Sequence, residues 1–219
     1  MFHKKIKEVF NRHGFPLTTN QLEQLTLFRT ELQRWNSHMN LTTLQDDNEI
    51  IYKHFLDSIS VLKHITIGEG QKVIDIGTGA GFPGVILKIC VPNICLTLVE
   101  ASQKKVAFLK YLISQLEFDA SPSVLALRAE NYVETEEFLN TYDWVFTRYV
   151  ASLADSVAYC LPLLKSSGRW IAYKSCEIDT EIKHSKNTLN LYGAEIEDIY
   201  ASTIDELNRT FVVIRKIIK

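Results

Sequence analysis

Apolar residues recur every three to four positions in two stretches of the first seventy residues, a pattern that predicts amphipathic helices. The stretch after Thr18 contains Leu22, Leu25, Leu32 and Trp35, and the stretch from 47 to 64 contains Ile51, Phe55, Ile59 and Leu62. Thr18 and Gln21 have the spacing of a capping box, which predicts the start of the first helix. We therefore expect residues 1–70 to form a helical extension that packs on the rest of the chain.

From about residue 70 onward, short apolar runs alternate with helical patterns. Extended segments are predicted at 73–76, 94–99, 123–127, 143–147 and 169–174, with two more between 194 and 218. Ser102 and Ser152 are expected to cap the helices that follow the second and fourth segments, and Ser167-Gly168 to end the segment before the fifth. Such alternation is typical of a parallel α/β sheet. We predict a Rossmann-like core over residues 71–219 with seven mostly parallel strands.

The first predicted strand runs through an acidic residue into a glycine-rich loop. Residues 73–84 read VIDIGTGAGFPG, in which Asp75 precedes Gly77, Gly79, Gly81 and Gly84. Glycine permits positive φ and lacks the Cβ atom that keeps a ligand away from the backbone. The loop can therefore turn sharply with its N–H groups facing a bound molecule. This pattern predicts a cofactor site at Asp75 and the glycines that follow it.

Two cofactors are compatible with this loop. Residues 79–84 satisfy the G-x-G-x-x-G pattern of dinucleotide-binding loops, and residues 75–81 satisfy the D-x-G-x-G-x-G pattern of S-adenosylmethionine enzymes. Asp75 would repel a pyrophosphate but suits the ammonium group of a methionine moiety, directly or through water. S-adenosylmethionine is favoured, and an oxidoreductase that uses a nicotinamide dinucleotide is the alternative.

The second predicted strand ends at Glu100, where a carboxylate can accept hydrogen bonds from ribose hydroxyls. Both cofactor classes use an acidic residue at this place, so Glu100 supports a nucleoside without distinguishing the two cofactors. The alternative is that Glu100 only provides negative charge near the start of the next helix. In doubly wound sheets, ligands bind beyond the carboxyl ends of the strands, which should bring residues 77–82, Glu100, the Ala129-Glu130 turn and Arg148 toward one crevice.

Composition narrows the class of protein. The chain has 219 residues, 46% of them hydrophobic, which is enough for one compact enzyme. The cysteines form no C-x-x-C motif and no metal-ligand spacing with histidine, so reduced thiols in the cytoplasm and no metal site are expected; they are Cys90, Cys95, Cys160 and Cys176. No stretch approaches the roughly 18 apolar residues that span a bilayer. The chain is expected to act as a monomer.

The formal net charge of −2 gives no overall attraction to nucleic acid. An RNA substrate would need a local basic surface, because neutralising phosphates requires clustered lysines and arginines. Candidates for that surface are Lys4, Lys5, Lys7, Arg12, Lys104, Lys105, Lys110, Arg128, Arg148, Arg169 and Lys174.

Several motifs together resemble the small-subunit ribosomal RNA methyltransferase G family, also called glucose-inhibited division protein B, over nearly the whole chain. They are Trp35-Asn36, Asn40-Leu41-Thr42, His54-Phe-Leu-Asp57-Ser58, the loop from Asp75 to Gly84, Arg148 with Ala151, and Tyr173-Lys174. The His-x-x-Asp-Ser motif and the Pro-Gly end of the loop are more selective than any glycine pattern. Two positions depart from the family pattern: Tyr149 stands where alanine is usual, and Ser175 where glycine is usual.

The resemblance implies a class I S-adenosylmethionine-dependent methyltransferase that modifies N7 of one guanosine in the 530 loop of 16S ribosomal RNA. The substrate would be 16S RNA or the small ribosomal subunit. Position by position, the resemblance places cofactor contacts at Gly77, Phe82, Ala129, Glu130 and Arg148. Our interpretation of the loop and the second strand adds Asp75, Gly79, Gly81 and Glu100. The competing hypothesis outside enzymology is a ribosome- or RNA-binding module whose cofactor pocket is silent.

Guanine N7 has an in-plane lone pair and no proton, so its methylation needs alignment rather than a general base. Arg148 could orient the cofactor or the guanine, and Lys174 could hold a phosphate or a guanine edge. Cys176 is a weak candidate for the nucleophile of pyrimidine C5 methylation, and an inert thiol is preferred. For His54 and Asp57 a structural hydrogen bond is preferred over a proton-transfer pair.

Overall fold

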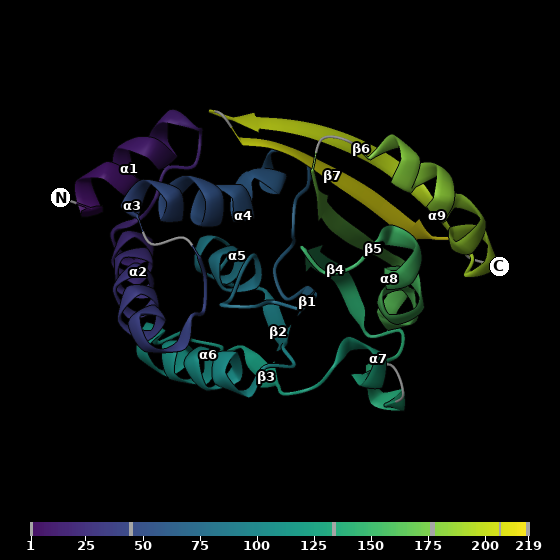
Figure 1. The fold of residues 1–219 in the computed structure, drawn as a ribbon, viewed down its shortest axis with the longest axis horizontal. Helices are drawn as coiled ribbons and strands as arrows, with labels where there is room; N and C mark the ends of the chain where they lie inside the picture. Colours follow the sequence, from purple (N-terminus) through teal and green to yellow (C-terminus); the bar gives the residue numbers. More distant parts are fainter. Residues whose placement is uncertain (1, 44–45, 133–134, 176–177, 206, 218–219) are drawn as a thin grey trace.

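The computed structural model describes residues 2–43, 46–132, 135–175, 178–205 and 207–217 (Figure 1). In this part of the chain the strands form one seven-stranded sheet, in the order β3-β2-β1-β4-β5-β7-β6. They are β1 (Lys72–Ile76), β2 (Cys95–Val99), β3 (Ser123–Leu125), β4 (Tyr142–Arg148), β5 (Leu164–Lys174), β6 (Ala194–Ile204) and β7 (Leu207–Lys216). The first five strands pair in parallel, and β7 is antiparallel to both β5 and β6. The predicted seven-stranded, mostly parallel sheet is confirmed.

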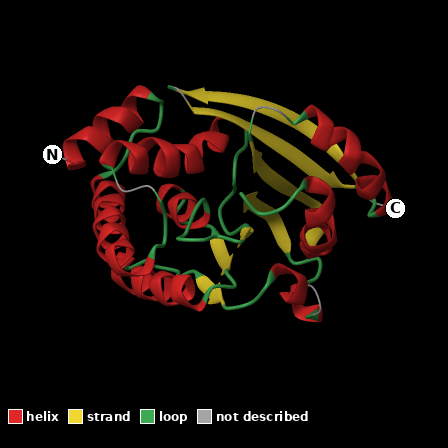
Figure 2. Cartoon of the chain, viewed as in Figure 1, coloured by secondary structure: helices red, strands yellow, loops and turns green. Residues whose placement is uncertain are grey.

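Helices cover both faces of the sheet (Figure 2). On one side lie α1 (Phe2–Arg12), α2 (Thr19–Met39), α5 (Gly84–Cys90) and α6 (Gln103–Leu116), and on the other lie α7 (Ala129–Tyr132), α8 (Leu153–Cys160) and α9 (Asp179–Leu191). Each side has its own hydrophobic cluster, and the sheet lies between the two clusters. Short 3-10 turns occur at Glu136–Phe138 and Leu161–Leu163. None of the helices in the described ranges has the length and apolarity required to cross a membrane.

The second helix predicted for the N-terminal extension, over residues 47–64, is present but is not a regular α-helix. It consists of α3 (Asp47–Glu49), a π-helix (Ile50–Leu56), α4 (Asp57–Ser60) and a 3-10 turn (Val61–Lys63). A π-helical turn changes which side chains share a face, and such turns are frequent at functional sites. In this protein the irregular segment turns His54 and Asp57 toward the sheet, where both contact Arg148.

The start of α2 confirms the predicted capping box: Thr18 Oγ1 accepts from the Gln21 N–H, and Gln21 Oε1 accepts from the Thr18 N–H. The Gln21 amide also donates to the carbonyls of Ile89 and Cys90 at the end of α5. The cap therefore fixes α2 against the core as well as starting the helix. A domain boundary at residue 70 stays a prediction.

Three local predictions were wrong. Ser102 occupies the N-cap position of α6, but its side chain makes no capping hydrogen bond. The third strand ends at Leu125 rather than 127. Residues 167 and 168 do not end the preceding segment, because β5 begins at Leu164 and runs through them. A Cβ atom on Gly168 would lie 2.8 Å from the Tyr142 carbonyl oxygen, so this glycine permits close approach of two strands where their register shifts.

Candidate cofactor and substrate site

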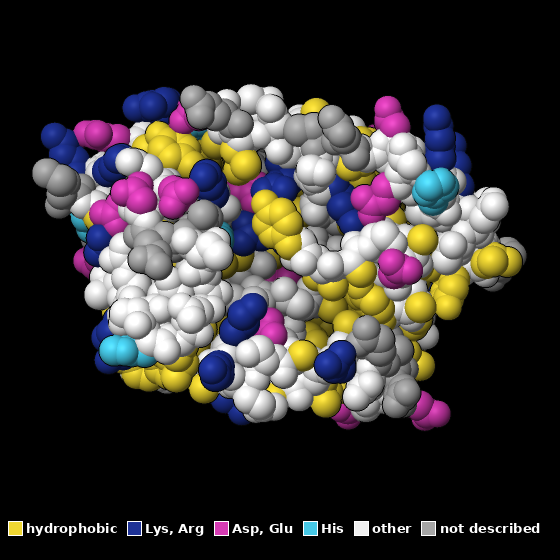
Figure 3. Space-filling model, in the orientation of Figure 1, with side chains coloured by type: hydrophobic (Ala, Val, Ile, Leu, Met, Phe, Trp, Pro, Cys, Tyr) yellow, Lys and Arg dark blue, Asp and Glu magenta, His cyan; other side chains and the backbone are white. Residues whose placement is uncertain are grey.

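The order of the strands reverses between β1 and β4, which pair directly in the centre of the sheet. In doubly wound sheets the ligand crevice lies at this switch point, beyond the carboxyl ends of the strands. The segments that begin at Gly77 after β1, Glu100 after β2 and Tyr149 after β4 meet there. On this face the surface is hollowed at its centre, and lysine and arginine side chains stand around the hollow (Figure 3).

Three glycines of the loop after β1 have positive φ: Gly77 at 70°, Gly79 at 63° and Gly81 at 100°. Their surroundings differ. A Cβ atom on Gly77 would lie 2.9 Å from Val150 Cγ2, so Gly77 gives the loop after β4 room to approach. A Cβ atom on Gly79 would meet only the Lys105 ammonium, at 4.0 Å. Gly79 therefore borders open space that a ligand can fill.

Most N–H groups of this loop are hydrogen-bonded within the protein. Gly77 and Thr78 donate to the Val99 carbonyl, and Gly81 and Phe82 donate to the Thr78 carbonyl. The sequence predicted that loop N–H groups would face a bound molecule, and for these residues that prediction was wrong. The reason is that the loop forms its own tight turns and stays hydrogen-bonded to the end of β2 without a ligand.

Glu100 connects the loop to the next helix. Its Oε2 accepts from the Gly79 N–H at 2.9 Å, and its Oε1 accepts from the Ser102 N–H at 2.8 Å. Each carboxylate oxygen has two lone-pair positions, so both oxygens can accept a further hydrogen bond from a ribose hydroxyl. The carboxylate is thus oriented in advance at the end of β2. Its bond to the Ser102 N–H also fits the alternative role near the start of α6, and its contact with a ribose stays a prediction.

A cavity of about 370 Å³ lies beside Glu100. It is lined by Ile76, Gly77, Val99, Glu100, Ala101, Leu127, Arg128, Ala129, Val150, Ala151, Asp155, Ala158 and Tyr159. Of the residues that the sequence placed in one crevice, Gly77, Glu100 and Ala129 line this cavity, whereas Phe82 and Arg148 do not. Apolar walls with few polar groups suit a ligand such as adenosine. Glu130 lies next to Ala129 in α7, and its side chain is outside what the structure describes.

Asp75 is completely buried at the middle of the sheet. Its Oδ2 accepts from the Gly84 N–H at 2.8 Å, at the start of α5. Its Oδ1 has no hydrogen-bond partner among the described residues. Burial raises the pKa of Asp75 to about 6, against the opposing effects of the nearby Thr78 side chain, the Gly84 N–H and the Arg148 charge. The carboxylate therefore fixes the end of the glycine loop, and its contact with a methionine ammonium stays a prediction.

We expect the Asp75→Asn variant to gain stability relative to the unmodified protein as the pH rises. Folding raises the pKa of Asp75 from 3.8 to about 6, so the stability contributed by the protonated carboxyl is present below about pH 4 and lost by about pH 7, a change of about 3 kcal/mol. The asparagine amide keeps an oxygen for the Gly84 N–H and has no charge to bury. Urea unfolding of both ligand-free proteins at several pH values measures the difference.

The buried His54 contributes a pH dependence of stability that is opposite to that of Asp75. Burial and the Arg148 charge lower the pKa of His54 to about 3. Its stabilising contribution is therefore lost as the pH falls below about 6.5. This contribution is the same in both proteins and cancels in the comparison. A stability difference that stays constant from pH 4 to pH 7 would contradict the Asp75 prediction.

Phe82 lies inside an aromatic stack. Its ring is parallel to His54 at 4.3 Å and to Phe28 at 5.1 Å, and the Arg148 guanidinium carbon lies 5.3 Å from its centroid. Only 4% of Phe82 is exposed. The side chain thus ties the glycine loop to the N-terminal helices, and its predicted contact with the cofactor stays a prediction.

His54 is held as a neutral imidazole. Arg148 Nη2 lies 3.3 Å from Nδ1, and Thr42 Oγ1 lies 2.9 Å from Nε2. A guanidinium can only donate, so Nδ1 accepts and Nε2 carries the proton that is donated to Thr42. The lowered pKa and this tautomer support the preferred structural role over proton transfer.

Asp57 joins three distant elements. It is completely buried in α4, and it binds Arg148 at the end of β4 and Arg209 in β7. Oδ2 accepts from Arg148 Nη1 at 2.8 Å and from Arg209 Nη2 at 3.0 Å, and Oδ1 accepts from Arg209 Nε at 2.8 Å. Arg209 is a site residue that the sequence patterns did not indicate. Arg209 lies just before the apolar run of β7. A charged residue in such a strand indicates a buried ion pair, because a buried charge requires a partner.

Lys174, at the end of β5, forms hydrogen bonds to other residues of the protein. Its ammonium donates to the Ala151 carbonyl and to Glu181 Oε1, both at 2.7 Å. These bonds connect the loop after β4 with the start of α9. The predicted contact of Lys174 with a phosphate or a guanine edge stays a prediction, and Cys176, the alternative nucleophile, lies outside the described residues.

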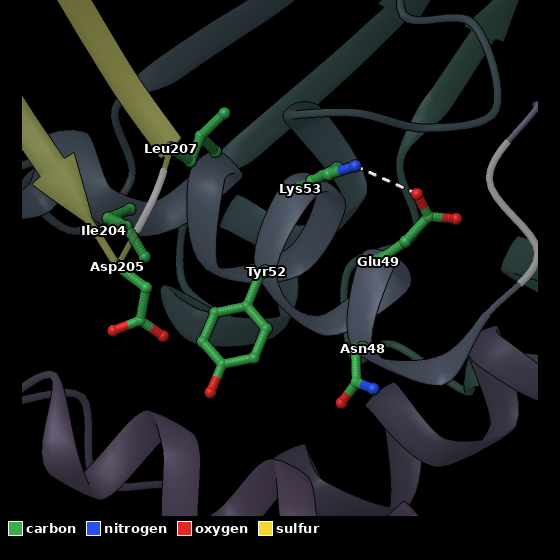
Figure 4. A pocket seen from close by; sticks show the side chains of 7 residues that line it. All are labelled: Asn48, Glu49, Tyr52, Lys53, Ile204, Asp205 and Leu207. Carbon is green, nitrogen blue, oxygen red and sulfur yellow. Dashed lines mark hydrogen bonds and ion pairs between the residues drawn. The ribbon is translucent and has the colours of Figure 1, made fainter.

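A second cavity, of about 460 Å³, lies between the π-helical segment and the β6–β7 turn (Figure 4). It is lined by Asn48, Glu49, Tyr52, Lys53, Ile204, Asp205 and Leu207. None of these side chains belongs to the predicted site. Across the described ranges, no three histidine, cysteine or acidic side chains gather in a way that would hold a metal ion.

The strand order and the glycine loop at the switch point define a class I S-adenosylmethionine-dependent methyltransferase fold. One similar solved structure is a SAM-dependent methyltransferase from Leishmania major, with a TM-score of 0.59 and 14% identity over 90% of this chain and 83% of that chain. The chain itself belongs to the family described as rRNA small subunit methyltransferase G, which matches residues 21–210.

Two relatives carry the description "Ribosomal RNA small subunit methyltransferase G". The protein from Caldanaerobacter subterraneus subsp. tengcongensis is 40% identical over 93% of this chain and 85% of its own length. A protein from Clostridium botulinum is 38% identical over 99% of this chain and 91% of its own length. These findings confirm the predicted family and fold. They favour S-adenosylmethionine over a nicotinamide dinucleotide as the cofactor.

Proposed function

We propose that this methyltransferase of small-subunit ribosomal RNA transfers a methyl group from S-adenosylmethionine to N7 of a guanosine in the 530 loop of 16S RNA. Family membership carries the substrate class. The cavity at the switch point supports the location of the cofactor site, because Gly77, Glu100 and Ala129 line it together. The base and its position rest on the resemblance of the motifs.

The donor's adenosine would occupy this cavity. Glu100 would accept from the ribose hydroxyls, while apolar side chains such as Leu127 and Val99 would contact the adenine. Gly79 would border the path from the cavity toward the methyl group, since open space lies beside its α-carbon. When bound, the cofactor supplies a sulfonium methyl group that a lone pair can attack. These residues bind and orient the donor.

Methylation of guanine N7 needs no general base, which agrees with the neutral, hydrogen-bonded state of His54 near the site. Guanine N7 attacks with its in-plane lone pair, so no proton has to be removed before the bond to the methyl carbon forms and the bond to sulfur breaks. The neighbouring His54 is buried, neutral and fully engaged with Arg148 and Thr42. Alignment of the acceptor with the donor is then the main task, and well-oriented reactants lower barriers by up to about 7 to 11 kcal/mol.

A local basic surface supports binding of RNA despite the overall negative charge. Lysine and arginine side chains surround the central hollow (Figure 3), Arg128 lines the cavity and the Lys105 ammonium lies beside Gly79. Arg148, Arg169 and Lys174 are ion-paired within the protein. Arg148 would orient the cofactor or the guanine, and Lys174 would hold a phosphate or a guanine edge. We place the reaction in the cytoplasm, with the chain acting as a monomer on 16S RNA or the small subunit.

The proposal predicts a specific product. Purified protein is incubated with methyl-labelled S-adenosylmethionine and small ribosomal subunits that lack methylation of the 530 loop, and the RNA is analysed by mass spectrometry. We expect the label as N7-methylguanosine in that loop. Label at another nucleotide would refute the assigned base. A protein that binds S-adenosylhomocysteine but labels no RNA would support the alternative of a silent cofactor pocket.

A further inference from the structure

Tyr149 is the first residue after β4, at the switch point of the sheet, and it is 72% exposed. Its φ of 55° lies in the left-handed region, which is unfavourable for a bulky side chain. Burial does not explain this conformation, because the ring lies outside both hydrophobic clusters. Strained residues of this kind concentrate at ligand-binding and active sites.

Two buried arginines hold the Tyr149 ring. Arg209 Nη2 donates to the Tyr149 hydroxyl at 2.6 Å. The guanidinium carbons of Arg209 and Arg148 lie 5.0 and 5.4 Å from the ring centroid. Both arginines are fixed by the buried carboxylate of Asp57. The ring is therefore exposed to solvent and yet immobilised, as a preorganised ligand contact must be.

The ring also lies next to the predicted donor site. The following residue, Val150, lines the 370 Å³ cavity. Its side chain packs so close to the glycine loop that a Cβ atom on Gly77 would be 2.9 Å away. Tyr149 thus stands one residue outside the cavity, next to the proposed donor site.

We propose that the Tyr149 ring is the platform on which the target base stacks during methyl transfer. This inference rests on the proposed function, in which the acceptor is a nucleobase. A base that reacts must leave its own stack, and unstacked bases pack on aromatic side chains. Stacking holds the face of the base and leaves its edges free. It therefore suits attack by N7, whose lone pair lies in the plane of the ring.

The test compares Tyr149→Gly with Tyr149→Phe. Glycine removes the ring and adopts positive φ without strain, so the thermal midpoint should not fall appreciably and affinity for S-adenosylhomocysteine should be unchanged. We expect kcat/KM for small subunits to fall about 5- to 150-fold, the range that corresponds to the known worth of base–aromatic stacking. Phenylalanine keeps the ring and should recover most of this loss.

An exposed tyrosine far from the site provides the matched control. Tyr192, at the end of α9, is 45% exposed, and the Tyr192→Gly protein should methylate at the unmodified rate. The proposal is overturned if Tyr149→Gly keeps full activity, or if Tyr149→Phe is as inactive as Tyr149→Gly. If the unmodified protein binds S-adenosylhomocysteine but methylates no RNA, the proposed function is refuted. The role of Tyr149 as a stacking platform is then refuted as well, because it depends on that function.

Discussion

Replacing Asp57 with alanine is expected to lower the free energy of unfolding by about 3 to 5 kcal/mol, the usual result of removing one partner from a buried ion pair. Asp57 is completely buried, and the side chains of Arg148 and Arg209 are only 5% and 3% exposed. Without the carboxylate, two guanidinium groups would remain in a region of low polarity with their charges uncompensated. Urea unfolding of the ligand-free protein measures the loss.

Two comparisons separate this effect from a general loss of charge. The Glu195–Arg215 pair is exposed, with side-chain exposures of 43% and 52%, so Glu195→Ala should cost no more than about 1 kcal/mol. Adding Arg148→Met and Arg209→Met to Asp57→Ala removes the stranded charges and should restore most of the lost stability. An Asp57→Ala protein as stable as Glu195→Ala would contradict the role assigned to this carboxylate.

Replacing Gly79 with valine is expected to weaken binding of S-adenosylhomocysteine by about 5- to 150-fold, because overfilling a fitted site costs about 1 to 3 kcal/mol. In the ligand-free protein a Cβ atom at this position meets only the Lys105 ammonium at 4.0 Å. The added side chain therefore fills space that the donor would occupy, and it leaves the hydrophobic clusters intact. Isothermal titration calorimetry measures the affinity.

Valine at Gly79 also strains the backbone, because the φ of 63° is unfavourable for a branched residue. Gly70 offers a matched control, with a φ of 71° and no atom within 4 Å of a Cβ atom placed there. Gly70→Val should lose comparable stability and keep the affinity for S-adenosylhomocysteine. If both variants bind equally well, Gly79 does not border the donor.

The central fold was predictable because its signals are local. The sheet, the glycine loop and the carboxylate at the end of β2 follow from hydrophobic periodicity and from the chemistry of strand ends. The same signals placed residues 77–82, Glu100, the Ala129-Glu130 turn and Arg148 in one crevice, and of these Gly77, Glu100 and Ala129 line the cavity. Family motifs added the small-subunit RNA methyltransferase assignment, which residue patterns alone did not supply.

The contacts that hold the site together were not predictable, because each joins residues far apart in the sequence. Periodicity does not show that Arg209 binds Asp57, and the motif that contains Phe82 does not show that its ring stacks between Phe28 and His54. Helices α1 and α9 were also missed. The hydrogen bonds of the loop N–H groups depend on how tightly the loop turns, which glycine spacing does not determine.

The ion pairs of Asp57 with its two arginines also set an order of events during folding. Asp57 is separated from Arg148 by 91 residues of sequence and from Arg209 by 152 residues. Contacts across such long separations form late, after local helices and nearby strand pairs. The Asp57 carboxylate therefore gains its second partner only when β7 pairs with β5, so the site is completed only after the antiparallel strands have joined the sheet.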